Sequence, residues 1–310
     1  MSWHDLGTWL FAGPFRNLWP LILIPGLAAV ISDATAALLP RRTETWLPAA
    51  LLAALPGLAA VCAAWPVLIT YGHVATWKGA ILLWLTPAVA LLILGRAVLR
   101  AWARQREVSR LFAAGAAPGP RLAAAAARLG LKARELPCDG RECFVAGVLR
   151  PTVFLSRGAL EQLGDAELEA ALHHERAHVR GGDTVLLFVL SFLRDLAPFG
   201  RAAALESFHA AREVIADREA ARHAGPLNLA SALVALARPP AAAAPQAALP
   251  LAKNETLRWR MQAILATEAD PPAPARSWAG VATGLSVNAA LLAWPLAQLQ
   301  LVCAFWAGWG

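Results

Sequence analysis

The chain has 310 residues, of which 58% are hydrophobic and only 16% are charged. Soluble domains are usually about one quarter charged, so this composition disfavours an ordinary soluble protein and indicates a membrane protein. The net charge of +7 comes without an aromatic-interleaved basic patch or a nucleic-acid-binding motif, so direct binding of nucleic acid is not expected.

Four apolar stretches are long enough to cross a bilayer as helices, which takes about 20 residues. They lie at about 18–39, 46–70, 79–99 and 278–299. Tryptophans stand at the starts of several of them, where aromatic side chains meet the membrane surface. The sequence therefore predicts three transmembrane helices in residues 1–100, and a fourth with a short tail in residues 278–310.

Basic residues predict the orientation of these helices. Arg41 and Arg42 lie between the first two stretches, and a dense cluster of arginines occupies residues 96–110, after the third stretch. Because basic loops favour the cytoplasmic side, we expect residues 40–45 and 100–277 in the cytoplasm and both termini outside.

The polar region 101–237 is large enough for a folded domain. Within it we expect helices and short strands, followed by an Ala/Pro-rich linker and a short helix in residues 238–277. The expected elements are a helix over 101–129, strands over 134–136, 143–148 and 152–155, and helices over 156–163, 165–180, 184–196, 204–224 and 257–267. Asp165 is expected to cap the helix over 165–180 at its N-terminus, and Gly181-Gly182 to end that helix.

Residues 174–178 read His174-Glu175-Arg176-Ala177-His178, which is an H-E-x-x-H motif. On a helix, residues four apart share a face, so both imidazoles can reach one metal ion. Glu175 stands beside the first imidazole and can take a proton from a water molecule. This arrangement predicts zinc-assisted hydrolysis, with His174 and His178 as metal ligands and Glu175 as the catalytic base.

A catalytic zinc (Zn²⁺) takes three protein ligands, and the third is expected from a later helix. Glu213 lies 35 residues after His178 and is the preferred candidate. Asp217 is one turn further along the same face, where it can orient a ligand histidine through its free ring nitrogen. Asp183, five residues after His178, is a second candidate for that role.

Other residues leave alternatives open. Glu206 is a reserve candidate for the third ligand. His209 is a candidate for contact with the developing oxyanion or the substrate, although a surface histidine is equally plausible, and Arg212 is a further candidate for such contact. Cys138 and Cys143 can pair in an oxidising compartment or remain free thiols.

The stretch 144–151, the segment 153–156 and the pentad 174–178 with Asp183 together resemble the BlaR/MecR-type antirepressor metallopeptidases. The resemblance implies a mainly α membrane protein in which a zincin-like α+β peptidase domain is inserted between the third and fourth of four transmembrane helices. It also implies His174, His178 and Glu213 as the zinc ligands.

The same resemblance implies a multi-pass zinc endopeptidase of the bacterial inner membrane that cleaves a protein substrate, such as a transcriptional repressor, at the cytoplasmic face. The sensors of this family carry a penicillin-binding domain after the fourth helix, whereas this chain stops at Gly310. A separate sensor protein as partner and a different signal altogether are therefore both open alternatives.

Two other functions remain open. The first is membrane quality control, as in the HtpX/CAAX-type zinc proteases, which share H-E-x-x-H and a downstream E-x-x-x-D. The second is a non-catalytic signalling protein with a structural zinc, closed by a fourth ligand such as Cys138 or Cys143. The presence of Glu175, which a structural site does not need, argues against the second.

Overall fold

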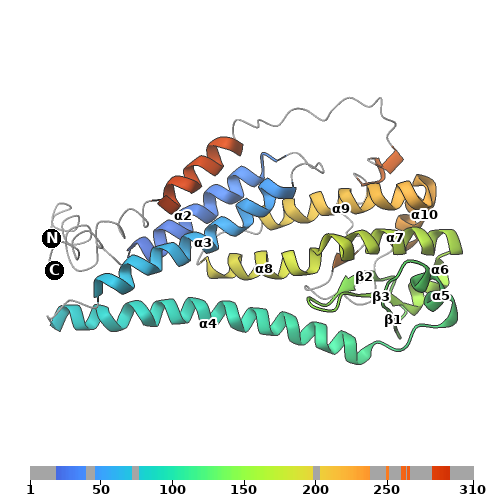
Figure 1. Cartoon of the computed structure of the whole chain (residues 1–310), viewed down its shortest axis with the longest axis horizontal. Helices are drawn as coiled ribbons and strands as arrows, with labels where there is room; N and C mark the ends of the chain where they lie inside the picture. The colour runs from blue at the N-terminus through green and yellow to red at the C-terminus, as the bar shows by residue number, and fades with distance from the viewer. Residues whose placement is uncertain are drawn as a thin grey trace.

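The computed structural model describes residues 19–39, 46–71, 77–197, 203–237, 249–250, 260–262, 264–265 and 281–293. Its named helices are α2 (Trp19–Ala36), α3 (Trp46–Tyr71), α4 (Trp77–Ala114), α5 (Pro120–Arg128), α6 (Arg157–Gln162), α7 (Asp165–Gly181), α8 (Asp183–Leu196), α9 (Ala203–Ala224) and α10 (Pro226–Leu236). Its strands are β1 (Ala133–Leu136), β2 (Cys143–Ala146), β3 (Thr152–Ser156) and β4 (Leu249–Pro250). Figure 1 shows the sheet at one end of an elongated helical structure.

The sheet has the order β1-β3-β2-β4, with β1 parallel to β3 and the other two pairs antiparallel. Both faces of its central strands are buried. Cys143 and Val145 point to one face of β2, and Phe144 points to the other, as the two-residue period of a strand requires. On that second face, Phe112 of α4 packs edge-on against Phe154. The sheet therefore lies between the C-terminal end of α4 and α7, the helix that carries the H-E-x-x-H motif.

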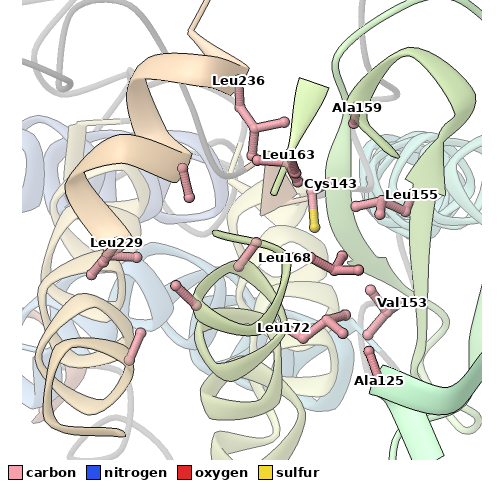
Figure 2. Close-up of a cluster of buried hydrophobic side chains, with 14 of the residues drawn as sticks. Ala125, Cys143, Val153, Leu155, Ala159, Leu163, Leu168, Leu172, Leu229 and Leu236 are labelled. Atoms are coloured by element: carbon pink, nitrogen blue, oxygen red, sulfur yellow. The ribbon is translucent and has the colours of Figure 1, made fainter. Parts of the chain in front are cut away.

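The main core lies between the sheet, α7 and α10 (Figure 2). Leu168 and Leu172 of α7 meet Val153 and Leu155 of the sheet, and Leu229 of α10 packs on the other side of α7. All of these side chains are almost completely buried. The face of α7 opposite the histidines is therefore fixed by apolar packing, which holds the helix in place for the site.

A second apolar cluster joins α2 and α3 to α8 and α9. Gly57 of α3 lies so close to α8 that a Cβ atom there would be 2.1 Å from the carbonyl oxygen of Leu193. Asp33 of α2 accepts a hydrogen bond from the backbone N–H of Ala204, at the start of α9. Asp33 thus stabilises a helix N-terminus, where orphan N–H groups favour a carboxylate.

The predicted short strands are present, with bounds that differ by at most a few residues from those expected. The single helix expected over 101–129 is wrong, because α4 ends at Ala114 and α5 starts at Pro120. Pro118 and Pro120 explain the break, since the residue before a proline is pushed out of the helical conformation.

The ends of α7 also refine the prediction. Gly164, not Asp165, is the N-cap, and its N–H donates to the Glu167 carboxylate at 2.8 Å. Gly182 adopts the left-handed conformation with φ of 65° and ends the helix as expected. Asp183 follows immediately as the first residue of α8.

The prediction of four transmembrane helices is contradicted. Within the part of the chain that the structure describes, no helix has both the length and the apolar character that a bilayer crossing requires. Part of the apolar surface of α2 and α3 is buried against α8 and α9, and α4 continues unbroken into the arginine-rich stretch. The described fold is mainly α-helical with a small sheet.

Several expectations fall partly or wholly outside the described residues. Most of the linker 238–277 is among them, although residues 260–262 and 264–265 are helical, in line with the short helix expected there. Residues 281–293 are helical within the stretch 278–299. The terminal residues and the loop 40–45 are not described.

We predict that Leu172→Ala lowers the free energy of unfolding by about 2–5 kcal/mol, because the side chain is fully buried between α7 and the sheet. Chemical denaturation followed by circular dichroism measures the change. Leu149→Ala is the matched control, since Leu149 is 92% exposed and its loss should matter by less than about 0.5 kcal/mol. Equal stabilities of the two variants would contradict this account of the core.

Candidate metal centre

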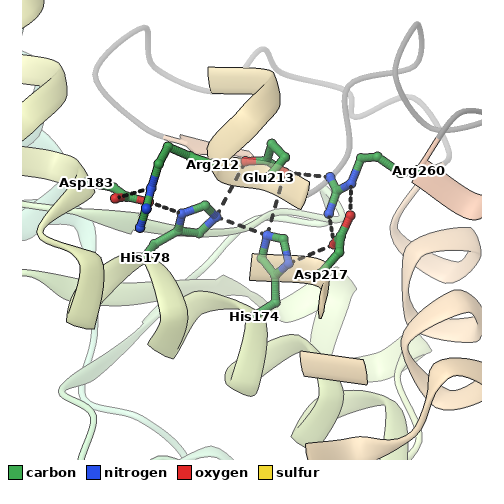
Figure 3. Close-up of polar contacts among 7 residues, drawn as sticks. All are labelled: His174, His178, Asp183, Arg212, Glu213, Asp217 and Arg260. Atoms are coloured by element: carbon green, nitrogen blue, oxygen red, sulfur yellow. Dashed lines mark hydrogen bonds and ion pairs between the residues drawn. The ribbon is translucent and has the colours of Figure 1, made fainter. Parts of the chain in front are cut away.

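The motif residues lie on the buried side of α7 that faces α9 (Figure 3). His174, Glu175 and His178 are each at most 1% exposed. The neighbouring helix α9 presents Glu213 and, one turn later, Asp217 to the two imidazoles. The structure therefore brings together residues from two helices that the sequence separates by a long interval.

Each imidazole is held by a carboxylate at its Nδ1 atom. Asp183 lies 2.7 Å from Nδ1 of His178, and Asp217 lies 3.0 Å from Nδ1 of His174. When Nδ1 donates its hydrogen to the carboxylate, the Nε2 atom of a neutral ring carries a free lone pair. Both rings are thus oriented to present Nε2 as an acceptor.

The two Nε2 atoms face each other and the Glu213 carboxylate. They lie 3.0 Å apart, and the Glu213 oxygens are 3.6 Å from Nε2 of His174 and 3.4 Å from Nε2 of His178. One ligand atom from each of the three residues falls within 4.8 Å of the others. When both imidazoles are neutral, three acceptors converge in one buried place, and a cation between them would offset their mutual repulsion, so the donor set fits a metal ion.

Asp183 has a second partner, Arg212, and this contact fixes the position of the Arg212 side chain. Nε of Arg212 lies 2.7 Å from Oδ1 of Asp183, whereas His178 contacts the other oxygen, Oδ2, of the same carboxylate (Figure 3). The predicted contact of Arg212 with an oxyanion or substrate is therefore not what this geometry shows. The guanidinium instead fixes Asp183. It passes where a Cβ atom on Gly181 would be 1.9 Å from Nη2 of Arg212.

Glu175 lies in the same buried place without entering the group of ligand atoms. Burial raises the pKa of its carboxyl, while the neighbouring histidines and Arg260 act in the opposite direction. A raised pKa is what a general base that works near neutral pH needs. The buried thiol of Cys143 is its neighbour, and burial together with the charge of Glu175 raises the pKa of that thiol well above its usual value.

Four other candidate residues take no part in the described group. Glu206 lies in the first turn of α9, and the ligand atoms that converge include Glu213 instead. His209 lines a cavity of about 100 Å³ between α4, α8 and α9. Cys138 and Cys143 are both free thiols, and neither belongs to the metal-binding group among the residues described.

Arg260 was not among the residues predicted from the sequence, yet it contacts two of the carboxylates beside the imidazoles. Its side chain is 1% exposed, and its guanidinium contacts Glu213 at 2.7 Å and Asp217 at 2.8 Å (Figure 3). Burial alone would raise the pKa values of Glu213 and Asp217, but Arg260 and the histidines lower them overall. No local pattern around residue 260 indicates this partnership, since it depends on a contact between distant parts of the chain.

We predict that zinc binding releases protons at neutral pH and that zinc affinity rises with pH. In the metal-free protein, burial opposes protonation of His178, but Asp183 and Glu213 outweigh it and raise its pKa to about 10. Below that pH a proton must therefore leave before Nε2 can bind a metal.

Calorimetry in two buffers of different ionisation enthalpy counts the protons released. Asp183→Asn removes one source of the raised pKa, so this variant should release fewer protons than the wild type. A zinc affinity that does not change between about pH 6 and about pH 8 would refute the prediction.

The family model described as BlaR1 peptidase M56 matches residues 59–264, which is more than half of the chain. The matched region includes the motif helix α7 and its partner α9, and the match confirms the resemblance seen in the motifs. No curated protein and no solved structure matches the chain. On the strength of the family match, and in agreement with the geometry of its buried histidines and carboxylates, the chain belongs to the BlaR1-type peptidase family M56.

Proposed function

We propose that this protein is a zinc-dependent endopeptidase that uses His174, His178 and Glu213 to hold the metal. The observation that carries the proposal is the convergence of the two Nε2 atoms and the Glu213 carboxylate, with both imidazoles oriented from behind by Asp183 and Asp217. Metal-binding histidines in proteins are oriented by carboxylates in this way. Three protein ligands leave one coordination position for chemistry.

The balance of buried charge supports a divalent cation. Four carboxylates gather here (Glu175, Asp183, Glu213 and Asp217), and the guanidinium groups of Arg212 and Arg260 contact three of them. With both imidazoles neutral, the ionised group carries two uncompensated negative charges. Buried charges require compensation, and Zn²⁺ supplies the amount that is missing.

Bound at this place, zinc would supply Lewis-acid activation of a water molecule and of the scissile carbonyl group. Glu175 accepts the proton of the attacking water, for which its raised pKa is suited. The same carboxyl then donates that proton to the leaving amine. Asp183 and Asp217 keep the imidazoles in the required orientation throughout.

A structural zinc site is less well supported. Such a site is closed by a fourth protein ligand. Among the residues that the structure describes, the metal-binding group consists of His174, His178 and Glu213, without Cys138 or Cys143. A carboxyl with a raised pKa beside the site is also unnecessary for structure, whereas it is needed for hydrolysis.

For the substrate we propose a protein, with a transcriptional repressor as the first to test. Membership of the BlaR1-type family supports this choice. A purified winged-helix repressor, incubated with the zinc-loaded enzyme, is the corresponding substrate for the assay below, and casein is the general one.

We predict that Glu175→Gln lowers the rate of cleavage by about 10²–10⁴-fold, because the variant has no carboxylate to move the proton. Zinc content should remain at the wild-type value, since Glu175 is outside the ligand group. Cleavage is measured by electrophoresis and zinc by atomic absorption.

Glu161→Gln is the matched control, because Glu161 is an exposed carboxylate on α6 whose loss should change neither quantity. If Glu175→Gln and Glu161→Gln cleaved the substrate equally well, Glu175 would not be the base.

We also propose that the enzyme works at the cytoplasmic face of a bacterial membrane, with its apolar surface on α4 in contact with lipid. Leu91, Leu92 and Leu99 share one face of α4 and are 65%, 73% and 65% exposed. This face ends at Trp102, over whose ring the guanidinium of Arg106 lies at 5.1 Å. Apolar side chains followed by an aromatic and a basic residue suit a lipid surface with anionic headgroups.

A flotation assay with vesicles of phosphatidylcholine and phosphatidylglycerol tests this contact. We predict that the wild type floats with the vesicles and that a variant with Ser at positions 91, 92 and 99 floats much less. Leu149 and Leu227 are also exposed but lie elsewhere, so a variant with Ser at both is the control and should float like the wild type. Equal flotation of the two variants would rule out this surface.

A further inference from the structure

Arg260 is brought to the metal centre by a short helical segment that lies beyond the linker. The segment is anchored in the main core, where Met261 and Ile264 pack against the buried cluster of α7, α10 and the sheet. The side chain of Arg260 is 1% exposed. A guanidinium so fully removed from water is expensive unless several partners compensate it, so its position is set by its contacts.

Those contacts involve both carboxylates of α9. Nε and Nη2 of Arg260 make a two-point contact with Asp217, at 2.8 and 2.5 Å, and Nη1 lies 2.7 Å from Oε2 of Glu213. Three nitrogen atoms of one planar group therefore fix two side chains that stand one helical turn apart. The planar fork of arginine permits this, and the point charge of a lysine does not.

Each contact acts on a group that faces the metal position. Oδ1 of Asp217 lies 2.5 Å from Nη2 of Arg260 and 3.0 Å from Nδ1 of His174, so it links the guanidinium to the imidazole. Oε2 of Glu213 is held by Arg260, while Oε1 lies 3.4 Å from Nε2 of His178. One guanidinium thus sets the orientation of Glu213 directly and that of His174 through Asp217.

We propose that Arg260 is a positioning residue for the metal centre, which is therefore assembled from three parts of the chain: α7, α9 and the segment after the linker. The inference rests on the proposed function, because it assumes that zinc is bound by His174, His178 and Glu213. A purely structural ion pair would change only stability. A positioning residue also changes metal affinity, and that difference can be measured.

The test compares Arg260→Ala and Arg260→Lys with the wild type. Zinc dissociation constants are measured by competition with a chromophoric chelator, and near-ultraviolet circular dichroism verifies that each variant is folded. Arg260→Ala should weaken zinc binding by about 10–100-fold, the range found when a group that orients metal ligands is removed. Arg260→Lys should fall between the two, because it keeps the charge but loses the two-point contact.

Chemical rescue separates positioning from general destabilisation. Guanidinium ion, added well below its denaturing range, should restore part of the zinc affinity of Arg260→Ala. Arg180→Ala is the matched control, since Arg180 is 60% exposed and its contact with Glu219 is long, at 3.5 Å. This control should bind zinc like the wild type, with or without guanidinium.

A folded Arg260→Ala variant with wild-type zinc affinity would overturn the inference, and so would weakened affinity that guanidinium ion does not improve. If Arg260→Ala does not fold, Arg260→Lys decides, and wild-type affinity in that variant would equally overturn it. A wild type that binds no zinc would remove the proposed function and this inference together. A wild type that binds zinc but cleaves nothing would remove only the peptidase function.

Discussion

Two close contacts between buried carboxylates and buried imidazoles set the geometry on which the candidate metal centre depends. Asp183 holds His178, and Asp217 holds His174, each through the Nδ1 atom. If either ring turned over, Nε2 would leave the point at which the three acceptors meet. Each carboxylate is held in turn by a guanidinium, Asp183 by Arg212 and Asp217 by Arg260. Each imidazole is therefore oriented by its own series of contacts, from guanidinium to carboxylate to ring, and the two series meet where the Nε2 atoms face each other (Figure 3).

Local patterns in the sequence were sufficient to predict the part of this site that lies on single helices. His174, Glu175 and His178 follow from the four-residue spacing of a helix face. Asp217 was predicted because it stands one turn from Glu213, and the structure places both beside the imidazoles. β2 and β3 were recognisable because β-branched and aromatic residues stand between turn-forming residues.

What the sequence could not reveal depends on contacts between distant segments. Arg260 meets Glu213 and Asp217 only because Met261 and Ile264 dock in the core, and no spacing rule relates position 260 to position 213. Arg212 was only a candidate for contact with an oxyanion or the substrate, and its contact with Asp183 at the start of α8 could not be predicted from spacing along the chain. The hydropathy of the chain likewise suggested separate membrane helices, whereas part of the apolar surface of α2 and α3 is buried against α8 and α9. Hydropathy indicates that a side chain favours removal from water, but the tertiary structure determines whether other parts of the protein cover it.

The two glycines at the junction of α7 and α8 do more than end a helix, because the positions of Asp183 and Arg212 also depend on them. Gly182 is left-handed, with φ of 65°, and delivers Asp183 to His178 within a single residue of the helix end. Gly181 has no side chain at the place where a methyl group would be 1.9 Å from Nη2 of Arg212. An alanine at position 181 would displace the guanidinium of Arg212. An alanine at position 182 would strain the backbone that carries Asp183. The alignment of His178 thus depends on the absence of two methyl groups. A substitution at either glycine would disturb the site, although neither residue is one of its candidate ligands.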